Sequence, residues 1–139
     1  MAYRKDWGNS PQIGPQGFAR TMKTIGRVVT IGTSDNVTGN TVGAFTVPAG
    51  FTVTSIYVVT TDLDSGAAML VTIGDSGSAA RYLASSNVGQ STTASTTLAA
   101  AGLLYKNTAE TEVLITIATQ AGTAVAGTMT IYLTGFIDN

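Results

Sequence analysis

Apolar and polar residues alternate with a period of two along most of the chain from about residue 21 onward. In residues 128–133, Met129, Ile131 and Leu133 face one way, while the threonines and Tyr132 face the other. Because successive side chains of a strand point to opposite faces of a sheet, this pattern predicts half-buried β-strands. The pattern also predicts strands at residues 51–60, 69–73, 79–83 and 113–117, with weaker ones at 27–33, 42–47 and near 103–106. Within 51–60 it places Phe51, Val53, Tyr57 and Val59 on one face.

Clusters of Gly, Pro, Asp, Asn and Ser separate these segments and predict turns. The one helix-like stretch, residues 98–104, is short and is interrupted by Gly102, so we interpret it as strand or loop. Residues 85–101, rich in Ser, Thr and Ala, are either a long loop between sheets or a flat polar strand. About eight short strands, with no helix to cover a parallel sheet, predict an all-β fold: a single antiparallel β-sandwich, jelly-roll-like.

The first twenty residues do not follow this pattern, because Gly and Pro interrupt them. They show neither the period of two of a strand nor the period of 3.6 of a helix. They nevertheless carry Tyr3, Trp7, Ile13 and Phe18, which a disordered tail usually lacks. Two interpretations remain open: an extended arm that docks onto another molecule, or a strand or cap folded back onto the same domain. We expect residues 1–20 to form the arm and residues 21–139 to form the β-sandwich domain.

Composition and charge favour assembly. Charged residues make up 11% of the chain, against roughly 25% in ordinary soluble domains, and there are 24 threonines. Residues 1–27 have a net charge of +4 and residues 28–139 a net charge of −5. A polar surface with little charge keeps monomers apart poorly, so it suits packing against copies or a larger partner. A β-rich domain with threonine on its solvent faces is the plainer alternative.

The chain contains neither histidine nor cysteine, which removes the usual general base and the Ser-His and Cys-His dyads. There is also no nucleophile motif, so we expect no enzymatic activity. The glycines at 122 and 127 have phosphate-loop spacing, but Thr128 replaces the lysine that this motif needs. The net charge of the basic N-terminal segment is too small, and its pattern too poor in interleaved aromatic residues, to predict nucleic-acid binding. No apolar run approaches the roughly 18 residues of a membrane span.

The clustered carboxylates are Asp62, Asp64 and Asp75. Oxygen ligands on a loop suit calcium, and paired carboxylates suit glycoside hydrolysis, but Asp-Ser-Gly is also ordinary turn chemistry. We expect structural turns, no metal and no cofactor. A single Arg on a strand usually pairs with a nearby acid, so we expect Arg81 to pair with Asp75 or Asp64, with a subunit contact as the alternative.

Residues 45–137 resemble small virion proteins of tailed bacteriophages, of the capsid decoration or cement type. The resemblance rests on a Pro-x-Gly turn and strand at 47–60, Asp-Leu-Asp-Ser-Gly at 62–66, Gly-Asp within 70–75, and Arg-Tyr within 80–85. It implies a β-sandwich on the capsid exterior, often a homotrimer, with an arm that reaches across neighbouring subunits. It does not separate a cement protein from a head-fibre or tail-associated module.

The expected function is that of a cement protein that binds capsomer junctions of the major capsid protein. The alternative is a head-fibre or tail-associated module that binds a receptor or glycan. We expect synthesis in the host bacterial cytoplasm and a final place on the outside of the virion, with no nucleic-acid or membrane partner. The role of the arm rests on charge and apolar content alone. Its candidate contacts with the capsid or another subunit are Tyr3, Arg4, Lys5, Trp7, Ile13, Phe18 and Arg20.

Overall fold

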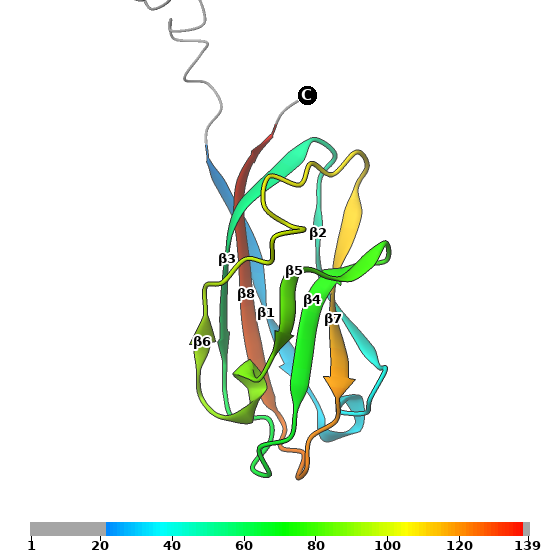
Figure 1. Cartoon of the computed structure of the whole chain (residues 1–139), viewed down its shortest axis with the longest axis vertical. Coiled ribbons are helices and arrows are strands. Elements are labelled where there is room, and N and C mark those ends of the chain that lie inside the picture. The colour runs from blue at the N-terminus through cyan, green and yellow to red at the C-terminus, as the bar shows by residue number, and fades with distance from the viewer. Residues whose placement is uncertain (1–21, 138–139) are drawn as a thin grey trace, which may run out of the picture.

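The computed structural model describes residues 22–137, and residues 1–21 and 138–139 lie outside the described part of the chain. The described part is a sandwich of two antiparallel sheets (Figure 1). Its elements are β1 (Lys23–Ile31), η3 (Thr33–Asp35), β2 (Thr41–Val47), β3 (Phe51–Thr60), β4 (Leu70–Asp75), β5 (Ser78–Ser86), η4 (Val88–Gln90), β6 (Ala94–Ser95), β7 (Thr111–Thr119) and β8 (Gly127–Ile137), where η marks a 3-10 turn. One sheet has the strand order β1-β8-β3-β6 and the other has the order β2-β7-β4-β5.

The strand pairs are nested along the chain. β4 and β5 form the innermost pair, and around it β3 pairs with β6, β2 with β7, and β1 with β8, all antiparallel. A long hairpin whose successive pairs alternate between two sheets is a jelly roll. The prediction of an all-β, jelly-roll-like sandwich with about eight strands is therefore confirmed.

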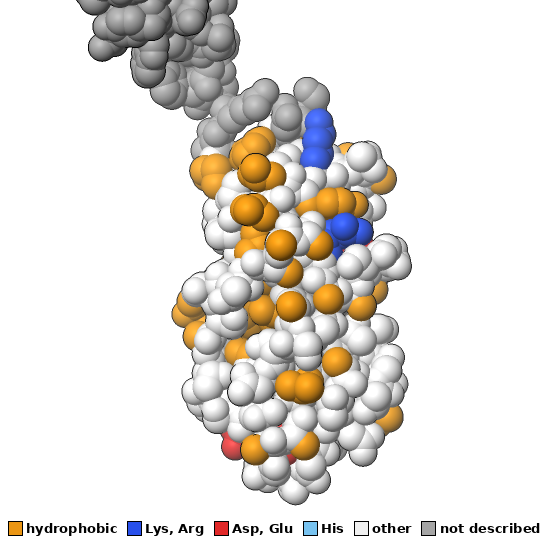
Figure 2. Space-filling view, viewed as in Figure 1, with side chains coloured by type: hydrophobic (Ala, Val, Ile, Leu, Met, Phe, Trp, Pro, Cys, Tyr) orange, Lys and Arg blue, Asp and Glu red, His pale blue; other side chains and the backbone are white. Residues whose placement is uncertain are grey.

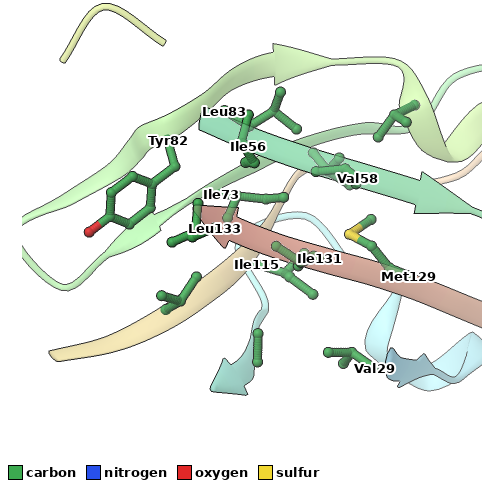
Figure 3. Packing of buried hydrophobic residues seen from close by; sticks show 14 of the residues in the cluster. Val29, Ile56, Val58, Ile73, Tyr82, Leu83, Ile115, Met129, Ile131 and Leu133 are labelled. Atoms are coloured by element: carbon green, nitrogen blue, oxygen red, sulfur yellow. The ribbon is translucent and has the colours of Figure 1, made fainter. Parts of the chain in front are cut away.

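The core lies between the sheets, where the inward faces of the strands meet. β8 contributes Met129, Ile131 and Leu133, all fully buried, as the alternation in this strand predicts. Figure 3 shows them in one cluster with Ile73 and Ile115 from the opposite sheet. Fully burying one such side chain contributes roughly 1.5–3 kcal/mol, so the inward stripe of β8 is a main source of stability.

Two inward-facing assignments are wrong. Regular alternation along residues 51–60 places Tyr57 and Val59 on the buried face, but the register with β8 shifts between Val53 and Ser55. An extra residue at such a β-bulge reverses the phase of the residues that follow it. Ile56 is therefore buried, whereas Tyr57 and Val59 lie on the outer face of the sheet. Of the surface of Tyr57, 46% is exposed.

The predicted strand near residues 103–106 is also wrong. Residues 100–104 form turns, and only Lys106 makes an isolated bridge, to Thr52 at the start of β3. The strand that pairs with β3 on this edge is the two-residue β6, within the segment for which strand and loop remained open. Between these two contacts the chain leaves β3 and crosses to β5, where Ala99 donates its N–H to the carbonyl of Tyr82 (2.9 Å). This excursion interrupts the ladder.

Replacing Ile131 with alanine tests the central position of β8. We expect the free energy of unfolding to fall by about 2–5 kcal/mol, because the change leaves a cavity between two sheets. The control is Thr130→Val on the opposite face of the same strand, which should change it by about 0.5 kcal/mol or less. Urea unfolding followed by fluorescence measures both. Equal effects of the two substitutions would contradict the assignment of faces.

Candidate docking surface

The Asp64 carboxylate holds two loops together. It is fully buried, and its oxygens accept N–H groups from the backbone of its own loop and from Thr123 of the loop before β8. This arrangement suits the ionised form of the carboxyl group. The donors in its own loop are Gly66 (2.7 Å), Ala68 (2.6 Å) and Met69 (2.7 Å). Burial by itself raises the pKa of Asp64, but the four N–H donors together lower it by more. The pKa of Asp64 therefore lies well below the ordinary range.

The other two carboxylates of the predicted cluster also have local partners. The Asp62 side chain accepts the backbone N–H of Asp64 (3.1 Å), as in an Asx turn. Asp75 accepts the backbone N–H groups of Gly77 and Ser78, each at 2.9 Å. Within residues 22–137, no group of three or more acidic, His or Cys side chains is placed to hold a metal ion. These carboxylates therefore stabilise turns by accepting backbone N–H groups.

Arg81 pairs with Asp75, the first of the two partners that the sequence left open. Its Nε and Nη2 donate to the two carboxylate oxygens, and its guanidinium stacks 3.8 Å from the ring centroid of Tyr105. Burial raises the pKa of Asp75, but the hydrogen bonds from Arg81, Ser78 and Gly77 outweigh it and leave that pKa lowered. The pair thus ties the β4–β5 hairpin to the segment that follows β6.

That segment ends in a turn with two exposed leucines. The carbonyl of Gly102 accepts the N–H of Tyr105 (3.1 Å), which closes a four-residue turn around Leu103 and Leu104. Their side chains are 59% and 62% exposed. The turn lies beside the start of β3, because Leu104 donates its N–H to the carbonyl of Val53 (2.7 Å). We call these two leucines the apolar tip.

The apolar tip lies at the end of the sandwich where β1 and β3 begin and β8 ends. In the β1-β8-β3-β6 sheet, the start of β1 pairs with the end of β8, and Ile137 at that end pairs with Phe51 at the start of β3. Met22 and Ile137 are exposed there as well, at 51% and 39%. Figure 2 shows hydrophobic side chains on the visible face near this end. The surface formed by Met22, Leu103, Leu104 and Ile137 is the entry-end surface.

A second uncharged surface covers the outer face of the β1-β8-β3-β6 sheet. Tyr132 of β8 lies directly opposite Tyr57 of β3 and Gly26 of β1. A Cβ atom at Gly26 would collide with the Tyr132 ring, so this glycine leaves room for the ring to lie across β1. Val28 adds a side chain that is 54% exposed. The outward positions of these three strands carry no charged residue in the part of the chain that the structure describes.

The seven contact residues predicted on the arm all lie outside the described residues: Tyr3, Arg4, Lys5, Trp7, Ile13, Phe18 and Arg20. Sequence reasoning did not identify the apolar tip, although two consecutive leucines after a glycine are an unusual choice for a turn. It did not place Tyr57 on the surface either, since the bulge has no clear sequence signal. The structure describes no helix that is long and apolar enough to span a membrane.

Comparison with known proteins relates this fold to phage capsids. No protein-family model matches the chain, and neither does any curated protein. A chain in the capsid asymmetric unit of cyanophage Pam1 is 27% identical with a TM-score of 0.73, over 85% of this chain and 86% of that one. A chain in the capsid of Ralstonia phage GP4 has the same fold, with 19% identity, a TM-score of 0.73 and 86% of each chain covered. The resemblance to phage virion proteins is thereby confirmed.

The lowered pKa of Asp64 predicts a pH-dependent stability. A carboxyl whose pKa is lower in the folded state stabilises the fold above its unfolded pKa, about 3.9, and this stabilisation is lost as the pH falls through the folded value. Asp64→Asn should therefore be much less stable than the wild type at pH 7, and this difference should shrink steadily below about pH 5. Urea unfolding at a series of pH values measures it.

Asp62→Asn is the matched control, because Asp62 accepts one backbone N–H where Asp64 accepts four. Its effect at pH 7 should be much smaller. A difference between Asp64→Asn and the wild type that stays constant from pH 7 to pH 2 would show that the charge of Asp64 does not stabilise the loops.

Proposed function

We propose that this protein is a non-enzymatic structural component of a tailed-phage virion that decorates the capsid exterior and stabilises it as a cement protein at capsomer junctions. The observation that carries the proposal is the shared fold, with 27% identity over 85% of this chain, with a chain of the cyanophage Pam1 capsid asymmetric unit. The surface supports it as well, because 11% charged residues and a Thr-rich composition suit permanent burial against neighbours.

Attachment to the shell uses residues 1–20 as an extended arm. Each large apolar anchor contributes roughly 1.5–3 kcal/mol when fully buried, whereas ordering the backbone costs about 1–2 kcal/mol per residue. Tyr3, Trp7, Ile13 and Phe18 therefore do not suffice to hold twenty residues by themselves. Backbone pairing with a capsid strand supplies the rest, and an acidic shell surface complements Arg4, Lys5 and Arg20.

Deleting residues 1–20 tests the arm. The truncated protein should keep its β-sheet circular dichroism, because every core residue that the structure describes lies between residues 29 and 133. Its binding to purified capsids that lack the protein should be sharply weakened. Trp7→Ala should weaken binding more than Lys5→Ala, since a buried aromatic is worth more than an exposed charge. The measurement is occupancy as a function of added protein, and truncated protein that binds as tightly as the full chain would refute this mechanism.

The protein acts as a homotrimer in this proposal, as the family resemblance implies. The outer face of the β1-β8-β3-β6 sheet supports self-association, because it is uncharged and exposes Val28, Tyr57 and Tyr132. Such a face is an unfavourable surface for a monomer in water. A copy that covers it buries the tyrosine rings while their hydroxyl groups reach polar partners at the rim.

The double substitution Tyr57→Ser with Tyr132→Ser should weaken self-association by about ten-fold or more, because each ring loses apolar burial. Analytical ultracentrifugation over a concentration series measures the effect. Val37→Ser is the control, since Val37 is as exposed as Tyr57, at 46%, but lies in the loop between β1 and β2. A wild-type protein that stays monomeric at high concentration without a capsid would contradict the trimer.

The alternative function, a head-fibre or tail-associated receptor module, is favoured by the same pair of tyrosines. Two exposed rings opposite each other on the outer face of one sheet can stack on a sugar. The number of copies per virion separates the functions, because a cement protein is present in hundreds of copies and a fibre or tail protein in about a dozen or fewer. A cryo-electron microscopy map of the particle determines that number and the position of the protein.

A further inference from the structure

Two adjoining hollows run along the side of the sandwich where both sheets end. β5 is the last strand of one sheet and β6 is the last strand of the other, within the part of the chain that the structure describes. One hollow has a volume of about 470 Å³ and the other a volume of about 210 Å³. Ser86 of β5 and Ser95 of β6 line both of them. We call the two hollows together the β5–β6 groove.

The walls of the groove combine small apolar surfaces with neutral hydrogen-bonding groups, and no charged side chain of residues 22–137 lines them. Ala67, Val88 and Ala94 supply apolar surface to the larger hollow. Asn87 and Ser91 line it as well, and their side chains make no hydrogen bond to any other described residue. The groove therefore suits a group that is mostly apolar and carries a neutral polar atom.

Hydrogen bonds fix the walls of the groove in the absence of an occupant. The Thr93 hydroxyl donates to the carbonyl of Val88 (2.6 Å). The side-chain amide of Gln90 donates to the carbonyl of Met69 (2.9 Å) and so ties the turn after β5 to the chain before β4. A group that enters a preformed hollow binds more tightly, because little of the protein has to become ordered.

The tyrosines on the outer face of the neighbouring sheet have matching chemistry. Tyr57 and Tyr132 lie opposite each other and are 46% and 37% exposed; we call them the tyrosine pair. A tyrosine side chain is an apolar ring with a hydroxyl group at its tip, and its burial is favourable where that hydroxyl group finds a partner. Neither the groove nor the outward positions around the pair carry a charged residue among those described, so contact between them buries no unpaired charge.

The symmetry of a trimer requires two different surfaces on each chain. A two-fold dimer pairs one surface with itself, whereas a ring of three joins each copy to the next through unlike surfaces. The two surfaces must meet at an angle, because surfaces on opposite sides of the chain build an open stack instead of a closed ring. The outer face with the tyrosine pair and the β5–β6 groove meet this condition, since β6 is the edge of the same sheet. Figure 1 shows β6 at the margin of the molecule.

We propose that the tyrosine pair of one copy inserts into the β5–β6 groove of the next copy, so that three identical contacts close a ring. The inference rests on the trimer of the proposed function and names the two surfaces that form its contact. Two copies joined in this way still present one open groove and one free tyrosine pair. The third copy binds both at once, and therefore more tightly than the second copy bound.

Two variants that each alter one surface test the contact. Tyr57→Ser with Tyr132→Ser removes the tyrosine pair and leaves the groove intact, whereas Ala94→Arg places a long charged side chain in the groove and leaves the pair intact. Each variant alone should associate at least ten-fold more weakly than the wild type, as measured by analytical ultracentrifugation. Thr92→Arg is the matched control. It adds the same charge two residues away, outside the lining of the groove, and should leave the trimer intact.

Mixing the two variants distinguishes unlike surfaces from a surface that pairs with itself. The Ala94→Arg chain keeps its tyrosine pair, and the chain with Tyr57→Ser and Tyr132→Ser keeps its groove. An equimolar mixture should therefore form a heterodimer through one intact contact, at concentrations well above those at which the wild type is fully trimeric. This heterodimer would also show that both variants are folded. A mixture without a heterodimer, or Ala94→Arg protein that associates as tightly as the wild type, overturns the inference.

The remaining results separate this inference from the proposed function. Wild-type protein that stays monomeric at high concentration overturns both the trimer and the contact. A wild-type dimer overturns the contact too, because a two-fold dimer uses one surface twice. The capsid function has its own measurement, the occupancy of purified capsids that lack the protein. Wild-type protein that is trimeric through this contact but does not bind these capsids overturns the capsid function and leaves the contact standing.

Discussion

The need to satisfy the backbone hydrogen bonds along the outer edge of β3 determines much of this structure. β8 pairs with one side of β3, but β6 reaches only Val58 and Val59 on the other. An unpaired N–H or carbonyl that is buried is costly, so the remaining edge needs a partner. Residues 104–107 supply it through Val53 and Phe51. The chain between β6 and this contact must therefore leave the sheet and return, and the turn by which it returns exposes Leu103 and Leu104.

The excursion of the chain also closes one open side of the sandwich. Gly102 packs against the carbonyl of Arg81 so closely that a Cβ atom would collide with it. The buried Tyr82 hydroxyl reaches Asn107 (3.4 Å), whose side-chain amide donates to the carbonyl of Phe51 (3.2 Å). These contacts join the two sheets by polar groups at the margin of an otherwise apolar core. The same residues thus complete the fold and support the entry-end surface.

Period-two alternation was sufficient to predict the sandwich and most strands, because each strand buries one face. The bounds of β3 agree with the prediction, yet its bulge reversed the inward and outward positions beyond Val53. A bulge depends on pairing with β8, some 75–85 residues away in the sequence, so the local pattern does not contain it. The apolar tip was missed for a similar reason: the positive φ of Leu104 results from the contact with β3, not from the preferences of leucine. The Arg81–Asp75 pair was within reach of the sequence because only six residues separate the partners.

The nested pairing also determines when β1 joins its sheet during synthesis. β1 forms its full ladder with β8, and the Thr24–Thr134 hydrogen bond closes a sequence separation of 110 residues. Contacts between distant parts of a chain form slowly, because the intervening loop loses its entropy before the contact is made. During synthesis, β1 has no sheet partner until the last strand leaves the ribosome. The segment that leads into β1 is therefore joined to a completed sandwich only after β8 has been made and has paired with β1.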